Sequence, residues 1–138
     1  MESNTNKGMQ LAARLGPRPE TTDHLPHSQL TQHGPDQIIE QLHKWCFSLP
    51  GVTNQPSGIS VPGARALVMA DEVVCNTEAF MIGREFAHIH PPPDNGSMHV
   101  KLPDFEAWEV LQKGWGEHHY LFSQGHLPIG LVLLFSHC

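Results

Sequence analysis

The stretch that decides the fold is REFAHIHPPPDNGSMHV, residues 84–100. Its proline-rich centre contains Asn95 and Gly96, a pair typical of tight turns. The flanking segments 77–90 and 97–102 are rich in apolar and β-branched residues. The stretch therefore predicts an antiparallel β-hairpin.

Side chains alternate between the two faces of a strand, so Phe86, His88 and His90 share one face and Glu85 lies on the other. A turn near 91–96 brings His99 of the returning strand beside His90 or His88. We therefore expect three imidazoles to converge on one face of the sheet.

The rest of the chain predicts helices at 35–49 and 103–114, one or two short strands within 57–74, and a closing apolar strand within 127–138. This order predicts an α+β fold with an antiparallel sheet of about four to five strands and two helices packed on one side. The side chains expected to face the sheet are Ile38, Ile39, Leu42, Trp45, Cys46 and Leu49 in the first helix and Phe105, Trp108 and Leu111 in the second.

Length and composition predict a single domain at 34–138, because 138 residues with 39% hydrophobic content suffice for one core. Residues 1–33 mix polar residues with proline and predict a loosely ordered N-terminal arm, with room for one short helix at 9–16 that docks on the body.

Charge and hydropathy exclude several classes of partner. The chain has 14 acidic and 8 basic side chains, a formal net charge of -6, which is unsuited to binding nucleic acid. No apolar run approaches the roughly 20 residues that cross a bilayer, and the amino terminus lacks an apolar signal region. We expect a cytoplasmic protein without a membrane partner. Its three widely spaced cysteines should be reduced thiols.

Three interpretations of the imidazoles remain open. Neutral imidazole is the commonest ligand of zinc, copper, iron and nickel, so His88, His90 and His99 could hold a divalent metal, and their H-x-H spacing partly resembles that of cupins. Without a metal, the same histidines could act as general acids or bases, tuned by a nearby carboxylate from the set Glu85, Asp94 and Glu117. The simplest interpretation is a half-solvated polar face without chemistry.

A second cluster, GWGEHHYLF at 114–122, follows the second helix. Glycines on both sides of Trp115 predict a sharp turn, and one of its two histidines must face inward if the segment is a strand. An inward His118 would complete the imidazole set. Trp45 and Cys46 of the first helix are expected to be core residues rather than catalytic ones.

The segments EFAHIHPPPDNGSMHVKLP, LQKGWGEHH and the apolar strand after LPIG together resemble the luciferase-domain family, a small domain found in bacteria and fungi. The resemblance extends over about 35–135 and implies a helix, an antiparallel sheet, a second helix and a final strand. It does not imply light emission, because no flavin fingerprint is visible and the chain is too short for a barrel of about 250 residues. The matching positions are Glu85, His88, His90, Ser97, His99, Trp115 and His118.

The resemblance also implies a small-molecule enzyme of natural-product metabolism. We expect it to carry out a non-redox cyclisation, elimination or isomerisation by imidazole acid–base chemistry, without a cofactor. The alternatives are a lyase or oxygenase that uses zinc or iron on His88, His90 and His99, and a non-catalytic binding protein; the chain could also form a homodimer. The expected catalytic residues are Glu85, His88, His90, His99 and His118, and the expected substrate-binding residues are Phe86, Ser97, Lys101, Trp115 and Tyr120.

Overall fold

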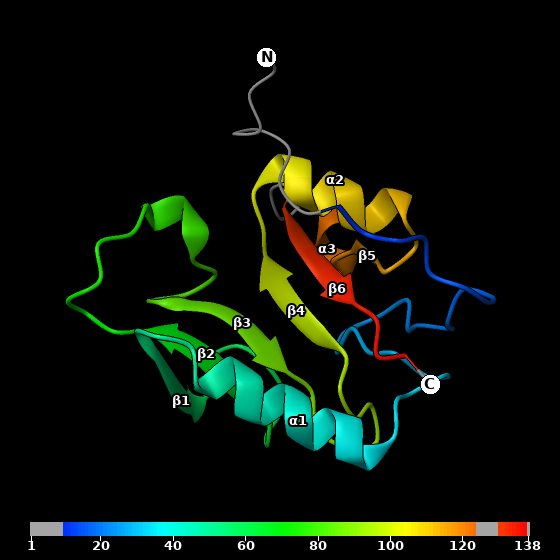
Figure 1. Ribbon diagram of the computed structural model, residues 1–138, viewed down its shortest axis with the longest axis horizontal. Helices are drawn as coiled ribbons and strands as arrows, with labels where there is room; N and C mark the ends of the chain where they lie inside the picture. The colour runs from blue at the N-terminus through cyan, green and yellow to red at the C-terminus, as the bar shows by residue number, and fades with distance from the viewer. Residues whose placement is uncertain (1–9, 124–129, 138) are drawn as a thin grey trace.

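The computed structural model describes residues 10–123 and 130–137, which form one six-stranded antiparallel sheet with the two longer helices on one face (Figure 1). The predicted α+β class is confirmed, with one strand more than expected. The strand order is β1-β2-β3-β4-β6-β5, and every neighbouring pair is antiparallel. The elements are α1 (Asp36–Phe47), β1 (Val52–Pro56), β2 (Arg65–Met69), the 3-10 helix η1 (Thr77–Ala79), β3 (Glu85–Ile89), β4 (Met98–Lys101), α2 (Asp104–Gln112), β5 (Gly116–His118), α3 (Tyr120–Ser123) and β6 (Leu131–Leu134).

The predicted hairpin is formed by β3 and β4. Its turn uses left-handed backbone at Asn95 (φ 52°) and Gly96 (φ 108°), the conformations that this residue pair adopts most readily. The turn is closed by two hydrogen bonds, from the His90 N–H to the Ser97 carbonyl (2.9 Å) and from the Gly96 N–H to the His90 carbonyl (3.1 Å). This register makes His88 and His99 direct cross-strand partners.

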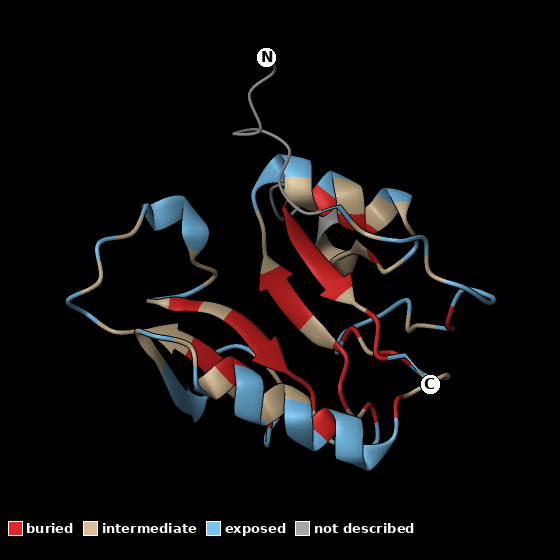
Figure 2. Cartoon of the chain, in the orientation of Figure 1, coloured by how far each residue is buried: buried red, intermediate tan, exposed pale blue. Residues whose placement is uncertain are grey.

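The main core lies between the sheet and the helices. Cys46 of α1 and Ala107 of α2 belong to the same buried cluster, so both helices cover one face of the sheet, as predicted. Figure 2 shows the buried residues concentrated along the central strands, with the outer sides of α1 and α2 exposed. The strand residues of this cluster are Leu67, Ala87, Ile89, Val100 and Val132.

The predicted helix faces were partly wrong. In α1, Cys46 is buried as expected, but Trp45 is 63% exposed. In α2, Trp108 is 60% exposed, and the buried residues are the smaller Ala107 and Val110. The reason is close packing: a Cβ added to Gly116 of β5 would lie 2.9 Å from a methyl group of Val110, so no bulky ring fits between α2 and the sheet. Ile38 and Phe105 are likewise exposed.

Residues 10–33 contain no helix, and the helix envisaged at 9–16 is not formed by residues 10–16. Within the arm, Thr21 and Gln29 pair in an isolated bridge. The buried Gln29 side chain fixes the arm to the body, because its amide N–H donates to the Ser136 carbonyl (2.9 Å) and its amide oxygen accepts from the Ser136 N–H (2.7 Å). Across 10–123 and 130–137, no helix has the length and apolar character needed to cross a bilayer. Cys46 and Cys75 are free thiols.

Candidate functional site

The imidazoles lie on the sheet face opposite α1 and α2. Ala87 and Ile89 of β3 point into the core, so His88 between them points to the other face, together with its cross-strand partner His99. His90 follows directly after β3. All three histidines are 3–5% exposed, and one ring nitrogen from each lies within 4.8 Å of the others. The predicted convergence of three imidazoles is confirmed.

A carboxylate holds His88. Its Nδ1 lies 2.8 Å from Glu85 Oε2, and Glu85 also accepts hydrogen bonds from the Ser57 hydroxyl (2.7 Å) and the Gly58 N–H (2.9 Å). Simple alternation had placed Glu85 on the opposite face from His88. The structure corrects this, because the pairing of β2 with β3 shifts register after Leu67, which leaves one extra residue in β3 and turns Glu85 toward the histidines.

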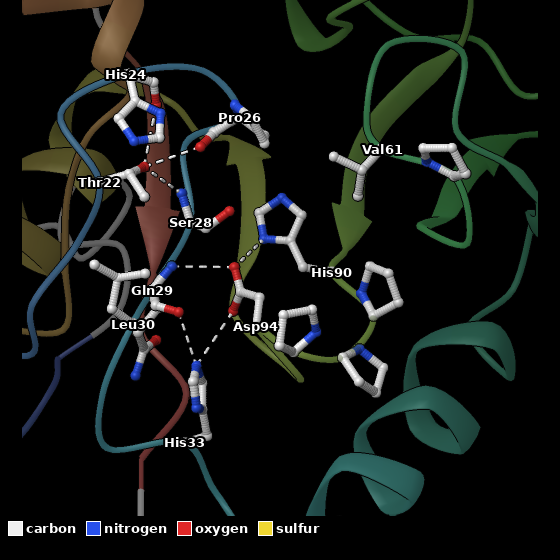
Figure 3. A pocket seen from close by; sticks show the side chains of 14 residues that line it. Thr22, His24, Pro26, Ser28, Gln29, Leu30, His33, Val61, His90 and Asp94 are labelled. Carbon is white, nitrogen blue, oxygen red and sulfur yellow. Dashed lines mark hydrogen bonds and ion pairs between the residues drawn. The ribbon is translucent and has the colours of Figure 1, made fainter.

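A second carboxylate holds His90. Its Nδ1 lies 3.1 Å from Asp94 Oδ2 and 3.0 Å from the Ser97 Oγ. The Ser97 hydroxyl donates to Asp94 Oδ1 (2.6 Å), and the Gln29 N–H donates to Asp94 Oδ2 (3.1 Å). Figure 3 shows Asp94 between His90, Gln29 and His33, so its carboxylate faces donors on three sides.

A third carboxylate is linked to His99 through His27, a buried residue of the N-terminal arm. The Nε2 of His99 lies 3.1 Å from His27 Nδ1, and the Nε2 of His27 lies 2.6 Å from Glu117 Oε2. The other oxygen of Glu117 pairs with Arg18 at the surface. All three carboxylates that the sequence suggested as tuners therefore lie against an imidazole.

His119, rather than His118, adds a further imidazole to this cluster. His118 pairs in register with Val132, a core residue, so its side chain points away from His99. The chain then leaves β5, and the ring centroid of His119 lies 4.4 Å from that of His99. The prediction of an inward His118 was therefore wrong. The Leu121 N–H donates to His119 Nδ1 (3.0 Å), so in the neutral ring the hydrogen lies on Nε2.

Burial keeps several of these rings neutral near pH 7. It lowers the pKa of His88, and burial together with the neighbouring imidazoles holds the pKa of His99 well below its ordinary value. Burial, followed by repulsion from the other histidines, lowers the pKa of His119 to about 4. These rings therefore offer lone pairs as well as N–H groups.

The carboxylates are ionised. Burial by itself would raise the pKa of Glu85, Asp94 and Glu117, but the hydrogen bond that each accepts from its imidazole, with further donors, outweighs burial and lowers the pKa of each. The site thus combines neutral imidazoles with three buried or half-buried negative charges.

A cavity of about 360 Å³ lies against the cluster. It shares Leu25, Ile59 and His119 with an apolar cavity of about 410 Å³, whose walls include Phe80 and Leu131. On its other side it shares Pro26, Val61 and His90 with the cavity of about 390 Å³ drawn in Figure 3. The imidazoles thus line the middle section of a groove. The full lining of the middle cavity is Leu25, Pro26, His27, Ile59, Ser60, Val61, His88, His90, His99 and His119.

The predicted substrate-binding residues are dispersed. Phe86 packs against the core cluster, because the bulge in β3 turns it away from the imidazoles. Ser97 is fully buried and binds Asp94, and the Trp115 indole N–H donates to the Ala12 carbonyl of the arm (2.7 Å). Lys101 lines the apolar cavity, whereas Tyr120 lines a separate cavity beside Glu117.

Two site residues, His27 and His119, were not predicted from the sequence. The only signal for His119 was its place beside His118, where strand alternation allows one of the two to face inward. His27 had no usable signal, because it lies in a proline-rich polar segment without periodicity.

Comparison with known proteins gives one match. The family model described as Luciferase domain matches residues 83–133, from the start of the hairpin to the third residue of β6. No curated protein and no solved structure matches the chain. The predicted resemblance to the luciferase-domain family is therefore confirmed over the segment that supplies His88, His90, His99 and Glu117.

Proposed function

We propose that the protein is a metal-dependent enzyme that acts on a small molecule, with His88, His90 and His99 as the ligands of a divalent transition-metal ion. The observation that carries the proposal is the direction of the hydrogen bonds. In each ligand ring, the outer nitrogen faces an acceptor and must carry the hydrogen, so the inner nitrogen of the neutral ring presents a lone pair. One ring nitrogen from each of the three histidines lies within 4.8 Å of the others, so these lone pairs would surround a space that one ion can occupy.

The bonds of His99 and His88 illustrate this most clearly. His27 Nδ1 accepts from the Tyr120 N–H (3.1 Å), so His99 Nε2 must donate to His27 and His99 Nδ1 has a lone pair. His88 Nδ1 donates to the carboxylate of Glu85, so its Nε2 also has a lone pair. These two lone-pair nitrogens lie only 3.1 Å apart. A cation held between the rings would relieve the repulsion of this contact.

The geometry and donor set suit a first-row transition metal. A tetrahedral zinc ion with Zn–N bonds of about 2.0–2.1 Å places its ligand nitrogens about 3.3 Å apart. His88 and His99 already have nearly this separation, and His90 Nε2 completes the set while its Nδ1 donates to Asp94. Ligand histidines that donate their other N–H to a carboxylate are the usual arrangement in metal proteins. Three neutral imidazoles leave at least one coordination position for substrate or water.

The groove defines the reaction class that we propose. An ion on this triad would act as a Lewis acid on an oxygen atom of the substrate, such as a carbonyl oxygen. The Nε2–H of His119 can donate a hydrogen bond to that oxygen. The adjoining apolar cavity would hold the hydrocarbon part of the substrate. We therefore propose a non-redox cyclisation, elimination or isomerisation, within natural-product metabolism as the family resemblance implies.

A second candidate function uses the same residues without a metal. Asp94 holds the Nδ1–H of His90, so His90 Nε2 is available at the cavity as a general base. This is the acid–base enzyme expected from the sequence. We also propose a cytosolic location and a homodimer, which a measurement of mass in solution tests.

Metal analysis separates the two candidates. Protein purified without a polyhistidine tag, supplied with zinc or iron and then freed of excess metal, should retain about one equivalent. His90→Gln should lose the metal, whereas His24→Gln, a change at an exposed histidine of the arm, should retain it. Wild-type protein that retains no metal, or equal metal retention by the two variants, would overturn the metal-dependent proposal in favour of acid–base chemistry.

A further inference from the structure

We infer that His27 of the N-terminal arm is a positioning residue of the metal site, which orients the ligand His99 and so makes the arm a working part of the site. The inference rests on the proposed metal site and extends it to a residue outside the family match at 83–133. His27 contacts no metal in this scheme; it acts through His99.

The ring of His27 is held in one orientation from both sides. It is 3% exposed, its Nδ1 receives the Tyr120 N–H, and its Nε2 donates to Glu117. Because Nε2 carries the hydrogen of this ring, Nδ1 has none to donate, and its lone pair is shared by the Tyr120 N–H and the N–H at His99 Nε2. His27 therefore fixes the tautomer of His99 that exposes a lone pair at Nδ1, the atom that faces His88.

His99 depends on the arm more than the other two ligands do. The acceptors for His88 and His90 are Glu85 and Asp94, which lie in the same hairpin segment as the rings they hold. For His99 the acceptor is a neutral ring from 72 residues away, and the carboxylate of Glu117 lies one ring further out. An outer carboxylate raises the basicity of a ligand imidazole, so the charge of Glu117 reaches His99 only through His27.

The same arm supports a second ligand two residues later. The Gln29 N–H donates to Asp94, which holds His90. The side chain of Gln29 is anchored on the backbone of Ser136, so this donor has a fixed place. The arm thus contacts the outer groups of two of the three ligands. Leu25 and Pro26 of the same segment line the cavity above them.

Because the arm and the metal contact the same ligands, their binding must be coupled. Docking of the arm raises metal affinity, and metal binding stabilises the docked arm by the same free energy. This reciprocity can be tested by two separate measurements on the whole chain.

The first measurement is metal affinity by competition with a chromogenic zinc chelator. His27→Phe keeps a ring of similar size but removes both nitrogens, and should weaken zinc binding by about 10–100-fold, the usual effect of losing an outer-shell partner. The matched control His24→Phe alters an exposed histidine three residues away and should bind as the wild type does. The Co²⁺ visible spectrum should change in His27→Phe alone, because the orientation of one ligand changes.

Glu117→Gln is the second variant, which covers the case that His27→Phe does not fold. It keeps an acceptor for His27 Nε2 but removes the charge, so zinc binding should weaken by a smaller factor. The second measurement is hydrogen exchange: zinc should slow exchange of the Gln29 amide in the wild type, and less so in Glu117→Gln.

The outcomes are separable. Wild-type affinity in both His27→Phe and Glu117→Gln overturns the role of His27 but leaves the metal site intact. A wild-type protein that binds no zinc or Co²⁺ removes the metal site itself, and with it the inference.

Discussion

Replacement of Asp94 by alanine is the sharpest test of the packing around the site. Asp94 is 6% exposed and accepts three hydrogen bonds, from the Gln29 N–H (3.1 Å), the Ser97 hydroxyl (2.6 Å) and His90 Nδ1 (3.1 Å). Asp94→Ala removes the acceptor of all three donors in a region that water does not reach freely. The variant should therefore lose far more stability than removal of an average surface charge.

The magnitude follows from how many donors stay unpaired. The Oγ of Ser97 already lies 3.0 Å from His90 Nδ1 and can accept from it, which rescues one donor. The Gln29 N–H and the Ser97 hydroxyl remain, and each buried unpaired donor costs about 1–3 kcal/mol. Some entry of water reduces the sum, so we expect Asp94→Ala to lower the free energy of unfolding by about 2–4 kcal/mol.

The assay is equilibrium unfolding in urea, followed by tryptophan fluorescence and circular dichroism, with a chelator present so that bound metal does not contribute. The matched control is Asp71→Ala, whose side chain is fully exposed and lies 3.9 Å from Arg84. It should change stability by less than about 0.5 kcal/mol. A loss below about 1 kcal/mol in Asp94→Ala would show that the carboxylate is not the buried acceptor described above.

Three further predictions concern other parts of the molecule. Burial lowers the pKa of His119 to about 4, so between this value and about 6.5 the unfolded chain binds more protons than the folded one. Wild-type protein kept metal-free by a chelator should therefore lose stability as pH falls through this window. Urea titrations at several pH values should show a smaller loss in His119→Gln. Burial raises the pKa of Cys46, so peptide mapping after brief alkylation should find Cys75 modified and Cys46 modified only after unfolding. A Cβ at Gly96 would lie 2.2 Å from the Ile39 side chain of α1, whereas a Cβ at Gly83 meets nothing within 4 Å. In thermal melts Gly96→Ala should therefore lower Tm more than Gly83→Ala does, and equal shifts would contradict this packing.

The hairpin was predictable because its determinants are local. The turn chemistry of Asn95-Gly96 fixes where the chain reverses, and strand alternation then fixes which side chains share a face. These two rules were enough to place His88, His90 and His99 together. Both act over neighbouring residues, which a single sequence displays directly.

Alternation failed where the backbone departs from regular geometry. The bulge in β3 exchanges the faces of Glu85 and Phe86, which brings the carboxylate to His88 and sends the ring into the core. The end of β5 has the same effect on His118 and His119. The prediction of the buried helix faces failed for a related reason, because the sequence shows which residues are apolar but not how closely a helix approaches its sheet.

The sequence by itself thus determined the α+β class, the hairpin and the meeting of three imidazoles, since each follows from periodicity and turn chemistry within short segments. Only the tertiary structure decided that His27, 72 residues from His99 along the chain, joins the site, and that the outer nitrogens of His88, His90 and His99 each face an acceptor. Such contacts depend on where distant segments cross in space. That is set by the packing of the whole molecule, and no local pattern in the arm records it.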